Sequence, residues 1–122
     1  MSLCLIAGGL ATLVAGAEFT LSWTHSVERT GWEERWTVEA QALHLVEARV
    51  RGSGAGMDPG EGARRADGWW VWTPTLPPVS ELVLAASGAT GEGWTLCDAG
   101  GDREACRTLG AEPEAPIVLR AC

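Results

Sequence analysis

Alternation of apolar and polar residues dominates the chain between residues 19 and 50. In residues 19–26, Phe19, Leu21 and Trp23 alternate with threonine and serine. Residues 32–39 and 43–50 repeat this period of two, which is typical of strands with one buried face. Short turns at residues 28–31 and 41–42 separate the three segments, and we therefore predict an antiparallel meander.

Shorter segments of similar character follow. We expect further strands over residues 68–73, 81–87, 93–97 and 117–122, and we find no convincing amphipathic helix. The 16 glycines and 6 prolines punctuate the chain often, which favours short strands and turns. A length of 122 residues allows one core. The pattern predicts a single all-β domain over residues 1–122, a small antiparallel β-sandwich or closed barrel of about eight short strands.

The apolar run from Leu3 to Val14 has two interpretations. It has the length of a signal-peptide core, and Ala15-Gly16-Ala17 resembles a cleavage site, but no basic residue precedes the run. Alternatively, residues 2–7 and 10–15 form a β-hairpin around Gly8-Gly9. Cleavage after Ala17 would remove Cys4 and leave an odd number of cysteines. The cysteine count therefore favours the hairpin, with any export signal lying upstream.

The four cysteines, Cys4, Cys97, Cys106 and Cys122, suggest two disulfides in an exported, periplasmic protein. Three connectivities are possible. The short, glycine-containing span between Cys97 and Cys106 suits a stapled hairpin or loop, which would leave Cys4 and Cys122 to join the two ends. The alternatives are reduced, buried thiols and a zinc site, although the chain contains no C-x-x-C pair.

The charge balance excludes several partners. A net charge of −7 repels nucleic acid and anionic membrane surfaces, so we expect neither nucleic-acid binding nor strong membrane binding. All nine basic residues are arginines, and the absence of lysine excludes Schiff-base chemistry and a phosphate-loop lysine.

Polar residues also fall on the tryptophan-bearing face of the three central segments. Charged groups on a core face are costly unless they are paired or line a wet cavity. We therefore predict a tryptophan-rimmed polar pocket for a small polar solute or a divalent cation, with an internal salt-bridge network as the alternative. The candidate ligand-binding residues are Trp23, His25, Glu28, Glu34, Trp36, Glu47 and Arg49.

Catalysis is the least favoured interpretation. His25 and Ser26 are neighbours on a strand and point to opposite faces, as do Glu33 and Glu34. No triad emerges, and we expect neither an enzyme nor a cofactor. The Trp69–Trp72 segment places Trp70 and Trp72 on one face and Trp69 on the other. This segment is either core or a docking patch for a protein partner or a sugar-like ligand.

Several strings of the chain carry a family resemblance: FTLSWTHSVERTGWEERW (19–36), EARVRGSGAGM (47–57), DGWW (67–70), and SGAT (87–90) followed by WTLC (94–97). With these strings the chain resembles a bacterial family, the domain-of-unknown-function family numbered eighteen-fifty. Members are often encoded beside TRAP transporters of the TAXI type, so the resemblance implies an accessory role in extracytoplasmic solute uptake, with transporter subunits as partners. It supplies no catalytic residue or cofactor. The other hypotheses are a structural or assembly protein without a small-molecule site and, last, a hydrolase.

Overall fold

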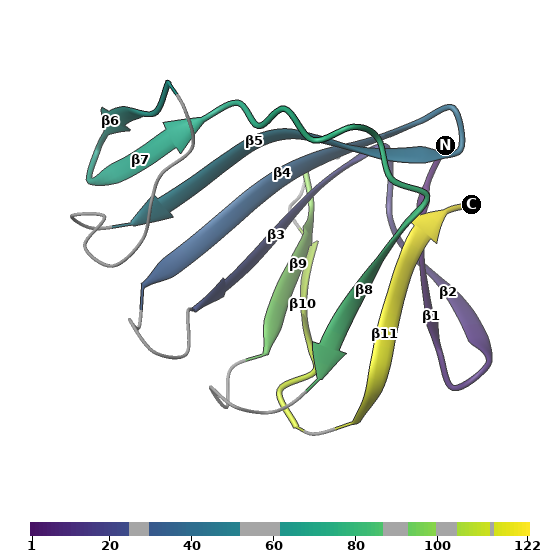
Figure 1. Cartoon of the computed structure of the whole chain (residues 1–122). Helices are drawn as coiled ribbons and strands as arrows, with labels where there is room; N and C mark the ends of the chain where they lie inside the picture. Colours follow the sequence, from purple (N-terminus) through teal and green to yellow (C-terminus); the bar gives the residue numbers. More distant parts are fainter. Residues whose placement is uncertain (25–29, 52–61, 87–92, 100–104, 113) are drawn as a thin grey trace.

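Antiparallel strands in two sheets form the described part of this computed structural model, which comprises residues 1–24, 30–51, 62–86, 93–99, 105–112 and 114–122. These residues contain eleven strands and no helix, and the sheets face one another without closing into a barrel (Figure 1). The prediction of an all-β sandwich is confirmed, whereas the closed barrel and the count of about eight strands are wrong. The small sheet has the order β2 (Leu10–Ala15), β1 (Leu3–Ala7), β11 (Glu114–Ala121), β8 (Glu81–Ala86). The large sheet has the order β10 (Ala105–Leu109), β9 (Trp94–Asp98), β3 (Glu18–Thr24), β4 (Gly31–Glu39), β5 (Ala42–Arg51), β7 (Trp69–Trp72), β6 (Arg64–Ala66).

The N-terminal residues form the predicted hairpin. Strands β1 and β2 pair around Gly8 and Gly9, whose φ angles of 58° and 81° lie in the left-handed region that glycine adopts without strain. Strand β1 also pairs with β11, so this hairpin is an integral part of the small sheet.

The predicted meander is confirmed as β3, β4 and β5, the centre of the large sheet. Two strands escaped prediction, β6 and β10, which lie at the two edges of that sheet. All three residues of β6 are exposed, as are the first four of β10. An edge strand with no buried face has no reason to alternate, and it therefore leaves no periodic signal.

The main core lies between the two sheets. Leu3 and Leu119 of the small sheet meet Phe19, Leu43 and Leu96 of the large one, and all five are at most 1% exposed. Burial of side chains of this size contributes roughly 1.5–3 kcal/mol each.

Strands β6 and β7 lie at the end of the large sheet that is remote from the small one (Figure 1).

A second core cluster covers that remote end of the large sheet. Ala48, Val50 and Trp72 are buried there, with Trp32 and Trp70 packed against them. A row of indoles connects the two clusters. Trp23 and Trp32 stack at 6.1 Å between ring centroids, Trp94 lies 4.9 Å from Trp23, and Trp72 meets Trp32 edge-on at 6.0 Å. As predicted, Trp70 and Trp72 share one face, opposite Val50 and Ala48, while Trp69 lies opposite Arg51 on the other.

Two disulfides close the fold, and both proposed pairs are confirmed. Cys4 and Cys122 join β1 to the C-terminus, where backbone hydrogen bonds of 2.9 and 3.2 Å also tie Ser2 to Cys122. The N- and C-termini accordingly lie side by side (Figure 1). Cys97 and Cys106 are directly opposite each other in the hairpin of β9 and β10.

The turn between β4 and β5 offers a stabilising substitution. Its central residues, Ala40 and Gln41, have φ angles of 50° and 64°, which non-glycine residues adopt at a cost. Asn-Gly is the preferred pair for such two-residue hairpins. We expect Ala40→Asn with Gln41→Gly to raise the free energy of unfolding by about 0.5–1 kcal/mol, measured by urea denaturation. The same pair at the exposed positions Thr75 and Leu76, which do not have positive φ angles, is the control, and equal stabilisation there would contradict the explanation.

Candidate functional site

A β-bulge in β5 divides the predicted polar cluster between two faces of the large sheet. Leu45 is opposite Trp36 and Glu47 is opposite Arg35, so Val46 is an extra residue on β5 with no partner on β4. Beyond the bulge the alternation is inverted: Ala48 and Val50 face the core, while Glu47 and Arg49 face outward. The prediction that Glu47 and Arg49 share the inner face with Leu43 and Leu45 is therefore wrong.

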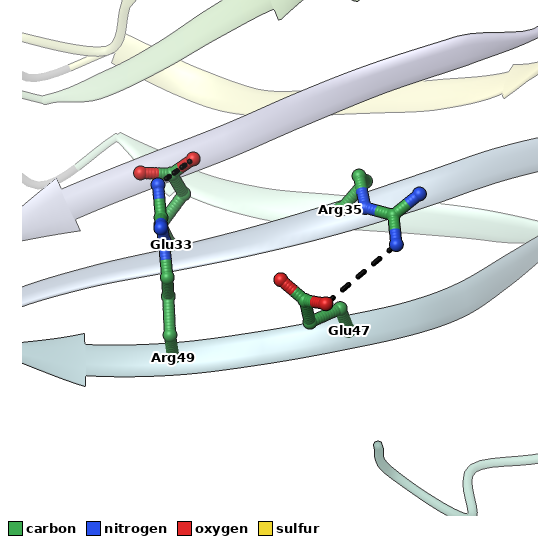
Figure 2. Close-up of polar contacts among 4 residues, drawn as sticks. All are labelled: Glu33, Arg35, Glu47 and Arg49. Atoms are coloured by element: carbon green, nitrogen blue, oxygen red, sulfur yellow. Dashed lines mark ion pairs between the residues drawn. The ribbon is translucent and has the colours of Figure 1, made fainter. Parts of the chain in front are cut away.

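On the outer face, these two residues take part in cross-strand ion pairs with β4. Arg49 Nη2 lies 3.0 Å from Glu33 Oε1, and Arg35 Nη2 lies 3.6 Å from Glu47 Oε2 (Figure 2). Both pairs are directly opposite in the strand register. Cross-strand pairs at such half-exposed positions contribute roughly 0.2–1 kcal/mol each. These two pairs lie on the outer face, so they are not the internal salt-bridge network that the sequence predicted as the alternative.

Arginine side chains also fix the orientation of Trp69 on this face. The guanidinium carbon of Arg49 lies 4.6 Å from the centroid of the Trp69 ring, and that of Arg51 lies 5.3 Å from it. Both distances are within the range of cation–π attraction. Arg49 therefore contacts Glu33 and Trp69 at once and links β4, β5 and β7.

A cleft of about 260 Å³ opens beside this group, where β3 ends and β4 begins. Hydroxyl side chains of β3 and β9 line it, together with the Glu33 carboxylate and the Trp69 indole. Of the predicted ligand-binding residues, Trp23 belongs to this cleft. The residues lining it are Ser22, Trp23, Thr24, Gly31, Trp32, Glu33, Trp69, Gly93 and Thr95.

Most of the cleft residues escaped prediction from the sequence. Ser22, Thr24 and Thr95 lie on the polar face of their strands, where hydroxyl residues are ordinary. The one signal of these residues in the sequence was Trp69. Alternation along its strand places it on the face opposite to Trp70 and Trp72, which is the outer face. His25 and Glu28 lie outside the described residues.

Of the predicted polar cluster, Glu34 and Trp36 lie on the inner face of the large sheet. The indole Nε1 of Trp36 donates a 3.1 Å hydrogen bond to Glu34 Oε1. Trp36 is 2% exposed and stacks on Phe19, so it is a core residue and does not rim a pocket. Burial raises the pKa of the Glu34 carboxyl above its usual 4.5, while the hydrogen bond from Trp36 acts in the opposite direction.

This pKa shift predicts how Glu34 affects stability at different pH values. A raised pKa in the folded state means that the charged form is disfavoured there, so stability falls as pH rises from 4.5 through the folded-state pKa. We expect Glu34→Gln, which keeps an acceptor for Trp36, to be more stable than wild type at pH 7. The advantage should vanish below pH 4.5. Urea denaturation at pH 4 and 7 tests this.

A matched control for that experiment is Glu47→Gln on the outer face, which loses the ion pair with Arg35. It should reduce stability at pH 7 by less than about 1 kcal/mol. A Glu34→Gln variant that is less stable than wild type at pH 7 would contradict the desolvation argument.

Metal ligands do not gather in the described part of the chain. No group of three or more His, Cys, Asp or Glu residues there could hold a metal ion. The divalent-cation alternative relied on His25 and the carboxylates, and the structure separates Glu34 from Glu47 on opposite faces of the sheet.

No helix among the described residues is long and apolar enough to cross a membrane.

Comparisons with known proteins agree with the resemblance seen in the sequence. No curated protein and no solved structure gives a significant match. Residues 19–104, more than half of the chain, match the family described as "Domain of unknown function (DUF1850)". This span contains strands β4 to β9, all of β3 except Glu18, and every residue of the outer-face cleft. The chain belongs to the DUF1850 family.

Proposed function

We propose that this protein is a non-enzymatic accessory protein of a TRAP-type solute uptake system, and that it binds a small polar solute outside the cytoplasm. The observation that carries the proposal is the outer-face cleft, a concave site lined by three tryptophans, three hydroxyl residues and a glutamate. Binding sites typically combine an apolar wall with a few polar groups of this kind. The uptake system as partner is inferred from the genomic neighbourhood that the family resemblance implies.

Binding is favoured over catalysis by the chemistry of the cleft. Among the described residues, Glu33 is the one titratable group that lines it, and the Glu33 carboxylate is held by the Arg49 guanidinium at 3.0 Å. A general base must be free to take a proton from the reacting group. A carboxylate neutralised by an arginine is suited to accepting a hydrogen bond, and this supports a binding role.

A location outside the cytoplasm is supported by the cysteines. All four form disulfides, two in a chain of 122 residues. Disulfides form and persist in oxidising compartments and are rare in the reducing cytosol.

The proposal is tested by isothermal titration with individual small sugars, polyols, amino acids, carboxylates and amines. We expect at least one probe to bind, and Trp69→Leu to weaken its binding at least about tenfold while the melting temperature stays within a few degrees. Val83→Thr, a change on the exposed face of the other sheet, is the control that should leave binding intact. Failure of every probe, or binding that is insensitive to Trp69→Leu, would contradict the proposed site.

The proposed partner has its own test. The tagged protein and the subunits of the adjacent transporter are co-expressed, and the protein is recovered from the periplasm. We expect the subunits to co-purify with wild type. Their absence under conditions where the tagged protein is folded and oxidised would count against the accessory role.

A further inference from the structure

The charges around the cleft disfavour a charged ligand. Glu33 and Arg49 neutralise each other at 3.0 Å. An anion bound beside the hydroxyls would face the Glu33 carboxylate, which lines the cleft. A cation would be repelled by Arg49 and Arg51, both within 5.3 Å of the Trp69 ring centroid. Among the described residues, an ion of either sign therefore has a like charge nearby, and this favours a neutral solute.

The polar groups that line the cleft are suited to binding a ligand that carries hydroxyl groups. Ser22 of β3 and Thr95 of β9 are directly opposite in the strand register, and Thr24 follows Ser22 on the same face. Each hydroxyl can both donate and accept a hydrogen bond, and the Glu33 carboxylate accepts. A solute with several hydroxyls of its own can satisfy all of these groups, whereas a simple ketone or ester offers only acceptors.

Trp69 supplies the apolar wall of the same site. Its ring lies against Gly31, where an added Cβ would be in van der Waals contact, 3.8 Å from the indole Cη2 and 4.0 Å from Arg51 Cβ. Gly31 therefore leaves space beside the ring that a side chain would occupy. The arginines of β5 fix the orientation of the indole. A flat, amphipathic ring of this kind suits a molecule with one C–H face and a rim of polar groups.

The size of the cleft limits the solute. A volume of about 260 Å³ is below the roughly 300–1,000 Å³ typical of sites for drug-sized ligands. The cleft therefore accommodates a single small ring or a short polyol.

From these four observations we infer that the solute is a neutral, polyhydroxylated molecule no larger than a monosaccharide, bound by Ser22, Thr24, Glu33, Thr95 and Trp69. This inference rests on the proposed function and specifies the class of its ligand. It also assigns Arg49 a specific task, which is to cancel the charge of Glu33 so that neutral ligands are preferred.

The experiment compares neutral polyhydroxylated molecules with small anions and cations, two of which are charged relatives of glucose. Isothermal titration uses D-glucose, D-ribose and myo-inositol as neutral probes, D-glucuronate and succinate as anions, and D-glucosamine and choline as cations. We expect at least one neutral probe to bind, and each charged probe to bind at least about tenfold more weakly. Gly31→Val, which fills the space beside Trp69, should abolish the binding of the neutral probe.

Glu33→Gln gives a directional test of the charge argument. It leaves Arg49 without its carboxylate, so binding of D-glucuronate should strengthen relative to D-glucose by about tenfold. Ser22→Ala with Thr95→Val should weaken the binding of the neutral probe about tenfold without this change in charge preference. Melting temperatures within a few degrees of wild type show that each variant is folded.

The outcomes separate the inference from the proposal on which it rests. Tighter binding of a charged probe, abolished by Gly31→Val, would overturn the neutral class and leave the cleft as a binding site. Binding of any probe that persists in the Gly31→Val and Trp69→Leu variants would place the ligand elsewhere and overturn both. Failure of all probes would likewise overturn both.

Discussion

Replacing Cys4 and Cys122 together by serine is expected to lower the free energy of unfolding by about 4–5 kcal/mol. The disulfide joins residues separated by 118 positions, so it closes almost the whole chain into one loop. In the chain-entropy account, a cross-link stabilises by restricting the unfolded ensemble, and the effect grows with loop length. Because single domains are stable by about 5–15 kcal/mol, this loss would leave the protein marginal.

Urea denaturation of the oxidised variant measures this effect, and the second disulfide is its internal control. Cys97 and Cys106 are 9 positions apart, so their replacement by serine should cost roughly 2–3 kcal/mol in the same account. We therefore expect the terminal disulfide to contribute more than the hairpin disulfide by about 2 kcal/mol. Equal losses, or a larger loss at the hairpin, would contradict the loop-length argument.

The strands that the sequence predicted well are those with one buried and one exposed face. Phe19 and Leu21 of β3 are 0% and 2% exposed, and Val38 of β4 is 3% exposed, as the period of two requires. Gly8-Gly9 and the cysteine count were sufficient to predict the N-terminal hairpin and the two disulfides. The exposed edge strands β6 and β10 were missed because no buried face imposes alternation on them.

The candidate site was predicted less well, and the reason is geometric. If side chains alternated strictly along the whole of β5, Glu47 and Arg49 would lie on the core face. The bulge at Val46 instead places both on the outer face. A single extra residue inverts the orientation of every side chain beyond it, and its position is set by pairing with β4. The cleft itself draws on β3, β4, β7 and β9, and only the three-dimensional arrangement brings these strands together.

Deletion of single residues from β5 should reveal this bulge directly, and deletion of Ala48 is expected to have a large effect. Ala48 is 4% exposed and lies opposite Glu34 on the inner face. Without Ala48, a regular ladder that keeps Leu45 opposite Trp36 places Glu47 opposite Glu34 in the core. If the bulge is retained instead, Arg49 turns inward and Val50 outward. Either arrangement buries a charged side chain, and we expect a loss of more than about 3 kcal/mol.

Deletion of Val46 is the matched control, and it should be far better tolerated. Removing the extra residue joins Leu45 to Glu47, so Leu45 stays opposite Trp36 and Glu47 stays opposite Arg35. Every side chain of β5 then keeps its face, and we expect a loss of less than about 1.5 kcal/mol from changed strand twist alone. Urea denaturation of the two deletion variants distinguishes these cases, since both lack one apolar residue of the same strand. Equal destabilisation would show that the bulge does not set the orientation of Glu47 and Arg49, and the outer-face ion pair of Arg49 with Glu33 would lose its structural basis.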